Sequence, residues 1–327
     1  MRKWILPEYI EDILPAEAER MEALRRSLLD HFRARGFRLV APPLLEHLDS
    51  LLTGTGRDLD LQTFKVVDPM SGHMLGVRAD ITPQVARIDA HLLNEPGITR
   101  LCYAGNVLRT TAGIGETREV AQIGAELFGE AGIAGDTEVI LLLLSSLAAA
   151  GVNRLHLDLG HVGVYRALAA GAGIGSESED SELFAALRAK DVPTVTALTA
   201  KLAPAWRDAL TALPSLYGPA EDVLAAARAR LPDTPAIRNA LASLGTLAKA
   251  AGPKVEALHI DLADLRGYHY HSGAIFSVFT PGRSAAIGNG GRYDGIGKAF
   301  GRARPATGFT LYLRQLADIV ARGGIAP

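Results

Sequence analysis

The sequence has one cysteine, few aromatic residues and almost no net charge. Cys102 is the only cysteine among 327 residues, so the chain cannot form an internal disulfide. Its neighbours in Leu101-Cys102-Tyr103 are apolar, which predicts a buried, unreactive thiol and not a nucleophile. A chain without a disulfide fits a reducing compartment, so we expect a cytoplasmic location.

A basic surface and a membrane segment are also lacking. Lys and Arg number 34 against 36 Asp and Glu, a formal net charge of −2, whereas tRNA or duplex binding ordinarily needs a basic footprint. The longest apolar stretch, 139–150, contains Ser145 and Ser146 and is shorter than the ~20 residues that cross a bilayer. The N-terminal residues show no apolar signal region. We expect no tRNA partner, no membrane partner and no export.

The usual phosphate-binding loops are absent. Gly297-Lys298 is no P-loop, because Arg292 stands where the upstream glycine belongs and Ala299 replaces the hydroxyl residue. The glycines of 288–291 fail as a dinucleotide fingerprint, because Tyr293 replaces the third glycine. Close backbone packing or a turn explains these glycines better.

One segment, 265–273, concentrates polar aromatic and cationic groups in an otherwise Ala- and Leu-rich chain. As a strand it would direct Tyr268 and Tyr270 to one face and His269 and His271 to the other. These histidines lack a zinc-ligand spacing, and the chain has no Gly-x-Ser-x-Gly elbow. If extended, the segment would border a pocket for a small polar ligand, and we expect neither a metal site nor acyl-enzyme chemistry.

Hydrophobic periodicity predicts most of the secondary structure. Apolar residues at helical spacing indicate a helix over 16–35 that Gly36 ends, and Thr82 as cap with Pro83 in the first turn indicates another over 82–93. A third helix is expected at 136–150. Strands are expected at 37–40, 74–77, 99–108, 120–128, 155–159, 255–261, 273–279 and 306–313.

The stretch 176–252 is different in character, with alanine-rich helical segments divided by six prolines. We interpret it as a helical insertion in a discontinuous domain formed by 1–175 and 253–327. The strands outside it lack a βαβ rhythm, which favours an α+β fold with an antiparallel sheet flanked by helices.

A possible binding face lies on the expected strand at 120–128. Gln122, Gly124 and Glu126 would share one face and present an amide beside a carboxylate. With Arg109 and Arg118 nearby, an ordinary solvated ion pair is the alternative interpretation. Adding Asp80, Thr82 and Arg266 supplies the groups that an amino-acid zwitterion needs, provided that the fold brings them together.

The order of these segments resembles that of class II aminoacyl-tRNA synthetases, specifically the histidyl-tRNA synthetase branch, and the resemblance covers most of the chain. It implies the synthetase-like antiparallel fold. Its segments, in family order, are Ile13-Leu14-Pro15, Gly36-Phe37 through Pro42-Pro43 to Glu46, Val77 to Thr82 with Arg109, Gln122 to Gly129, Arg266-Gly267, and Gly290 to Asp294.

The resemblance also implies a site for free L-histidine. Asp80, Thr82 and Gln122 would hold the α-amino group, Glu126 would accept the imidazole N–H, and Arg266 would face the carboxylate. The implied histidine site is completed by Arg109, Tyr270 and His271. Asp80 replaces the family's glutamate, and His271 falls where the family has a tyrosine.

Other departures concern ATP. Thr111 replaces an acidic residue, and at the last motif Tyr312, Arg314 and Gln315 replace a glycine, an acid and the ATP-binding arginine. Losing an arginine from a phosphoryl clamp should cost orders of magnitude in rate. The chain also ends at Pro327, where a synthetase would continue into an anticodon-binding domain.

A histidine site without this equipment resembles the regulatory subunits of ATP phosphoribosyltransferase. That resemblance implies a non-catalytic partner of the short-form catalytic subunit in the first step of histidine biosynthesis, with L-histidine as feedback effector and no cofactor. It also implies a homodimer contact near residues 36–46. A histidyl-adenylate-forming paralogue and a scaffold with a vestigial site are the alternatives.

Overall fold

The computed structural model describes residues 5–54, 56–113, 117–174 and 177–323, and it divides into two compact units. The first unit contains 1–131, 145–153 and 294–327, and the second contains 132–144 and 154–293. The division into 1–175 with 253–327 and an insertion at 176–252 stays a prediction, and residues 176 and 324–327, on which parts of it rest, lie outside the described residues.

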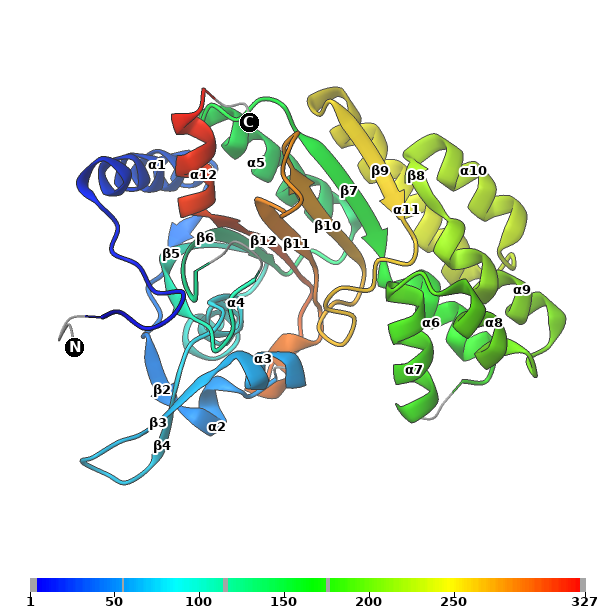
Figure 1. Cartoon of the computed structure of the whole chain (residues 1–327), viewed down its shortest axis with the longest axis horizontal. Coiled ribbons are helices and arrows are strands. Elements are labelled where there is room, and N and C mark those ends of the chain that lie inside the picture. Colours follow the sequence, from blue (N-terminus) through cyan, green and yellow to red (C-terminus); the bar gives the residue numbers. More distant parts are fainter. Residues whose placement is uncertain (1–4, 55, 114–116, 175–176, 324–327) are drawn as a thin grey trace. The chain divides into compact units, whose positions relative to one another are not determined.

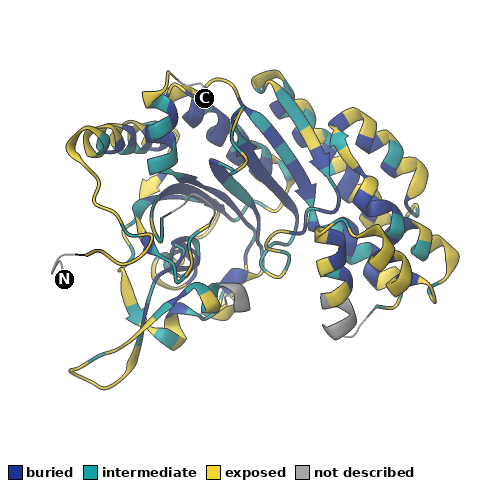
Figure 2. Cartoon of the chain, viewed as in Figure 1, coloured by how far each residue is buried: buried dark blue, intermediate teal, exposed yellow. Residues whose placement is uncertain are grey.

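The first unit carries four strands in the order β1-β5-β6-β12, with β1 parallel to β5 and the other pairs antiparallel. Their bounds are Arg38–Leu39, Thr99–Leu108, Glu119–Phe128 and Ala306–Tyr312. A separate antiparallel sheet has the order β2-β4-β3, with bounds Leu45–His47, Met74–Val77 and Phe64–Val67. The outer part of the β3–β4 hairpin is exposed, whereas β5, β6 and β12 are largely buried (Figure 2). The core of this unit therefore lies around β5, β6 and β12.

Helices α1 (Pro15–Arg33) and α12 (Leu313–Ala321) contact each other and pack against β5 and β6 (Figure 1). As predicted, α1 buries its apolar stripe, and Phe32 meets Phe309 of β12 edge to face with ring centres 5.8 Å apart. The shorter helices of this unit are α2 (Leu48–Leu51), α3 (Arg57–Gln62), α4 (Thr82–Arg87), the π-helix η1 (Ile88–Leu93) and the 3-10 helix η4 (Ile296–Phe300).

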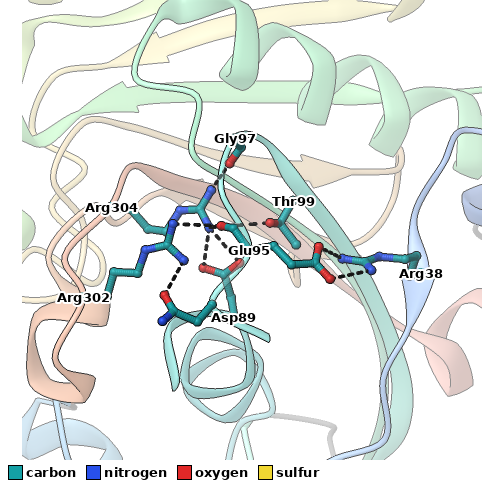
Figure 3. Close-up of polar contacts among 8 residues, drawn as sticks. Arg38, Asp89, Glu95, Gly97, Thr99, Arg302 and Arg304 are labelled. Carbon is teal, nitrogen blue, oxygen red and sulfur yellow. Dashed lines mark hydrogen bonds and ion pairs between the residues drawn. The ribbon is translucent and has the colours of Figure 1, made fainter. Parts of the chain in front are cut away.

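A buried ion pair anchors the start of β12 in the first unit. Arg304 donates to both oxygens of Asp89 at 3.1 and 3.2 Å, and it also contacts the carbonyls of Glu95 and Gly97 (Figure 3). Both side chains of the pair are almost fully buried. The pair therefore ties η1 and the loop before β5 to the segment that enters β12.

The second unit carries five strands in the order β11-β10-β7-β9-β8. Their bounds are Gly288–Arg292, Ala274–Phe279, His156–His161, Ala257–Asp261 and Tyr217–Pro219. Its helical elements are α6 (Val162–Gly171), α7 (Glu177–Arg188), α8 (Val192–Thr199), α9 (Pro204–Ala212), η2 (Leu213–Ser215), α10 (Ala220–Arg230), α11 (Pro235–Ala251) and η3 (Gly252–Lys254). Helix α5 (Ile133–Ala149) contributes to both units. Helices α6 and α11 contact the strands of the second unit.

Two expectations need correction and a third holds. Residues 266–270 form turns and not a strand, and β10 begins at Ala274. The close backbone packing expected among the glycines of 288–291 is found at Gly291 in strand β11, where a Cβ would clash with the carbonyl of Ala274. Thr82 is the first residue of α4 and not its cap, because its hydroxyl is directed elsewhere.

Cys102 is buried on β5, as predicted, and burial raises the pKa of its thiol to about 11, which disfavours the reactive thiolate. Among the described helices, none is long and apolar enough to span a bilayer.

Candidate functional site

A polar face is built from three rows of directly opposed residues on β5, β6 and β12. Residues that oppose each other in an antiparallel pair project to the same side of the sheet. The rows are Leu101, Glu126 and Gly308; Tyr103, Gly124 and Thr310; and Gly105, Gln122 and Tyr312. Each row contains one glycine, on a different strand each time.

Each of these glycines makes room for a polar side chain. A Cβ at Gly308 would overlap the carboxylate of Glu126, and one at Gly124 would overlap the hydroxyl of Tyr103. A Cβ at Gly105 would meet the guanidinium of Arg78, a buried arginine that donates to the carbonyl of Asn106. The face can therefore hold charged and hydroxyl groups that a residue with a Cβ at these positions would displace.

Glu126 lies within a group of hydroxyls. The Thr82 hydroxyl donates to Glu126 Oε1 at 3.1 Å and lies 3.3 Å from the Tyr103 hydroxyl. The Tyr103 hydroxyl is 2.6 Å from that of Thr310 on β12. Burial, followed by the nearby carboxylates of Glu126 and Asp80, raises the pKa of Tyr103 well above its ordinary value, so the phenol keeps its proton.

Asp80 and Gln122 lie beside this group. Asp80 Oδ1 accepts the backbone N–H of Thr82 at 2.8 Å, and Asp80 Oδ2 accepts from Gln122 Nε2 at 3.4 Å. Gln122 Oε1 accepts from the backbone N–H of Ile81 at 3.3 Å. The first unit thus brings together four of the site residues expected from the sequence, and their role in binding stays a prediction.

Arg109 lies directly after β5, where the pairing of β5 with β6 continues. Its backbone N–H donates to the carbonyl of Arg118, and its Nε donates to the carbonyl of Ala79 at 3.3 Å. The guanidinium of Arg118 stacks over the ring of Phe64, 4.6 Å from its centre. Arg109 is thereby held next to the segment that carries Asp80.

The remaining expected residues belong to the second unit. Arg266 forms a forked pair with Asp264, with N–O distances of 2.9 and 2.5 Å, and this hydrogen bonding raises the pKa of Arg266. Tyr270 stacks on Tyr293 with ring centres 5.0 Å apart. Arg266 therefore already has a carboxylate partner within its own turn.

His271 is fixed in one tautomer. Its Nδ1 lies 3.2 Å from the carbonyl oxygen of Arg292, and a carbonyl can only accept, so Nδ1 carries the hydrogen and Nε2 is left as an acceptor. Burial lowers the pKa of His271 to about 4, so the ring is neutral near pH 7.

The turn that carries these residues is supported from α6 and α7. Arg166 donates to the carbonyls of Tyr268 and His271, both at 2.7 Å, and its guanidinium lies 4.8 Å from the centre of the Tyr268 ring. Phe184 of α7 packs on Tyr268 with ring centres 5.2 Å apart. Tyr268 is thus a packing residue and does not line a strand face.

The end of β12 shows where the departures from the synthetase pattern fall. Tyr312 opposes Gln122 and projects to the same face, so a ring stands in the row of Gln122. Arg314 pairs with Glu17 at 2.7 Å and with Glu11 at 2.8 Å, among residues of the N-terminal segment and α1. Within the described residues, no group of three or more His, Cys, Asp or Glu is placed to hold a metal ion.

Tyr103 and Thr310 were missed in the sequence analysis. The apolar run Leu101-Cys102-Tyr103 indicates only that Tyr103 is buried, although a fully buried tyrosine requires a partner for its hydroxyl. Alternation along the strand at 306–313 would have placed Thr310 on the face of Gly308, but only the pairing of β12 with β6 opposes it to Gly124.

Comparisons with known proteins identify the family and the fold. A family model described as histidyl-tRNA synthetase matches residues 9–316. The ATP phosphoribosyltransferase regulatory subunit of Ralstonia nicotianae is 59% identical over 320 residues, which cover 98% of this chain and 82% of the relative. The protein of the same name from Thiobacillus denitrificans is 59% identical over 317 residues, 97% of this chain and 98% of the relative.

Among solved structures, an ATP phosphoribosyltransferase regulatory subunit/histidyl-tRNA synthetase from Bacillus halodurans is similar, with a TM-score of 0.86 at 27% identity. The match covers 97% of this chain and 83% of that one. The predicted α+β fold of the class II synthetase type is confirmed.

Proposed function

The chain belongs to the ATP phosphoribosyltransferase regulatory subunits, which share the histidyl-tRNA synthetase fold, and from this premise we propose how it performs that role. It is a non-catalytic subunit that acts with the short-form catalytic subunit in the first step of L-histidine biosynthesis, in the cytoplasm. The catalytic subunit depends on it for activity.

L-Histidine is the effector that this chain senses. The observation that carries this proposal is the face formed by Glu126, Thr82, Gln122 and Asp80. Its two carboxylates, hydroxyl and amide lie together and offer hydrogen-bond acceptors to an ammonium group and an imidazole N–H. Histidine transmits feedback inhibition because it prefers one arrangement of the complex. A coupling of roughly 1–3 kcal/mol changes the partner's activity several-fold or more.

Adenylate formation and aminoacylation are not part of this function. The ring of Tyr312 stands in the row of Gln122, and Arg314 is engaged by Glu17 and Glu11. Gln315 cannot supply the bidentate positive charge of an arginine. These features disfavour the adenylate-forming paralogue, and they are consistent with a partnership that involves no tRNA.

The chain also forms a homodimer through the segment 36–46. Strand β1 has β5 as its neighbour at one side and otherwise ends the sheet order. Leu39, Leu44 and Leu45 are 51%, 51% and 46% exposed, which is apolar surface that a second copy would cover.

The test is the rate of phosphoribosyl-ATP formation by the purified catalytic subunit, with and without this chain and with added L-histidine. Activation that histidine reverses supports the proposal. No effect on a competent catalytic subunit contradicts it, and histidine-dependent pyrophosphate exchange would favour the adenylate-forming alternative. Calorimetry with histidine separates a sensor from a scaffold, because a scaffold gives no heat above dilution and the Glu126→Ala variant abolishes any true signal.

A further inference from the structure

Four side chains of the first unit are connected one to the next by hydrogen bonds. Thr310 of β12 contacts Tyr103 of β5 at 2.6 Å, Tyr103 contacts Thr82 at 3.3 Å, and Thr82 contacts Glu126 at 3.1 Å. Tyr103 and Glu126 are 0% and 1% exposed, and Thr310 is 8% exposed. Three of the four side chains are therefore buried, and Thr82 is partly exposed.

The direction of every bond in this series follows from the proton count. The Thr82 hydroxyl gives its single hydrogen to Glu126 Oε1. Tyr103 must then donate to Thr82, and having one hydrogen it must accept from Thr310. The raised pKa of Tyr103 keeps that hydrogen in place.

We propose that Tyr103 and Thr310 are positioning residues of the histidine site, which act through Thr82 to hold Glu126 as an oriented acceptor for the imidazole N–H. This inference rests on the proposed function. Neither residue needs to touch the ligand. Both act by orienting the hydroxyl hydrogen of Thr82 toward Glu126 Oε1.

The same series determines which ligands are accepted. The carboxylate of Glu126 is a hydrogen-bond acceptor, so a ligand must bring a donor to it. A ring that lacks an N–H cannot make this hydrogen bond and should therefore bind more weakly. Thiazol-4-ylalanine has a ring of similar shape to imidazole but no N–H. The ratio of the dissociation constants for thiazol-4-ylalanine and L-histidine therefore measures how well Glu126 is held.

The experiment is calorimetric titration of the full chain with both ligands for the wild type, Tyr103→Phe and Thr310→Val. Each variant removes one hydroxyl at nearly constant shape. We expect L-histidine to bind roughly three- to tenfold more weakly to each, with a smaller loss for thiazol-4-ylalanine, so that the ratio falls. Thr310→Ser should keep the wild-type ratio of the two dissociation constants, because serine retains the hydroxyl.

Two further variants sharpen the test. In the Tyr103→Phe background, Thr310→Val should have no additional effect on the ratio, because both changes interrupt one series. Thr307→Val is the matched control. Thr307 is a fully buried threonine on the same strand whose hydroxyl has no hydrogen-bond partner within the described part of the chain, and its replacement should leave both affinities unchanged.

The outcomes separate this inference from the proposed function. If the wild type binds histidine and both hydroxyl deletions leave the ratio unchanged, the positioning role is overturned and the histidine sensor stands. If a deletion weakens both ligands equally, the residue is merely structural and the inference fails. If the wild type binds no histidine, the effector role itself is wrong and the positioning role falls with it.

Discussion

Gly308 of β12 and Glu126 of β6 oppose each other directly, and the carboxylate of Glu126 occupies the space that a Cβ at position 308 would fill. The conformation of Glu126 therefore depends on a missing side chain on the neighbouring strand. The same holds for Tyr103 and Gly124 one row along.

Gly308→Ala should displace the Glu126 carboxylate. We expect histidine affinity to fall by at least about tenfold and the free energy of unfolding to fall by about 1–3 kcal/mol, because the added methyl group overpacks a buried row. Calorimetry and urea denaturation measure the two effects. Gly295→Ala is the control, since nothing lies within 4 Å of its Cβ position and its φ is −83°. Wild-type histidine affinity in Gly308→Ala would contradict the role assigned to this row.

Removing one partner of the buried Asp89–Arg304 ion pair should lower the free energy of unfolding more than removing one partner of an exposed ion pair. Asp89→Ala leaves the Arg304 guanidinium buried without its carboxylate, and we expect a loss of about 3–5 kcal/mol in the free energy of unfolding, measured by urea denaturation. Replacing both members by apolar residues should cost less than Asp89→Ala alone. Arg38→Ala removes one side of the exposed pair with Glu95 and should remain close to the wild type.

Stability should fall on acidification because of His271. Its pKa is lowered to about 4 in the folded chain from 6.5, so above pH 6.5 neither state binds the proton. Between pH 6.5 and about 4 only the unfolded chain is protonated, which removes about 3 kcal/mol across that window. His271→Asn keeps a donor toward the carbonyl of Arg292 and should flatten this part of the curve.

Thermal or urea unfolding at several pH values measures this dependence. His161, whose pKa is also lowered to about 4 by burial, contributes in the same window, so His271→Asn should remove part of the slope and not all of it. An unchanged slope in His271→Asn would show that the histidine titrates normally in the folded chain.

Arg166 should control the order of the turn at 266–272. Nη2 of Arg166 donates to both the Tyr268 and His271 carbonyls, and Arg166→Lys loses the planar guanidinium that holds this nitrogen in place over the Tyr268 ring, so amide exchange in this turn should accelerate. Hydrogen exchange read by mass spectrometry tests this. Arg188→Lys, on the exposed side of α7 near Phe184, is the comparison and should leave exchange in the turn unchanged.

Local patterns predicted much of the secondary structure. The stripe of α1, the exact bounds of β4 and β5, and the buried thiol of Cys102 follow from periodicity and composition, because each depends on neighbours in the chain. Four site residues, including Asp80 and Glu126, were selected by side-chain chemistry and resemblance, and the first unit places them together.

The alternation of tyrosine and histidine within 265–273 is typical of a strand, but the segment is not one. The segment turns instead at Gly267, whose φ is 61°, and Arg166, about a hundred residues earlier, binds two of its carbonyls. Strand β11 was missed for the opposite reason, since glycines have low strand propensity, and at Gly291 close contact with Ala274 and His271 leaves no room for a Cβ.

The sequence alone determined where the main strands and helices form, which family the chain resembles and which chemical groups are available. The tertiary structure decided which of those groups meet. Tyr103, Thr82 and Thr310 come from three distant segments, and the register of β5, β6 and β12 together with the position of α4 places their hydroxyls in series with Glu126. A strand's own pattern assigns a residue to a face, whereas the partner strand decides what opposes it.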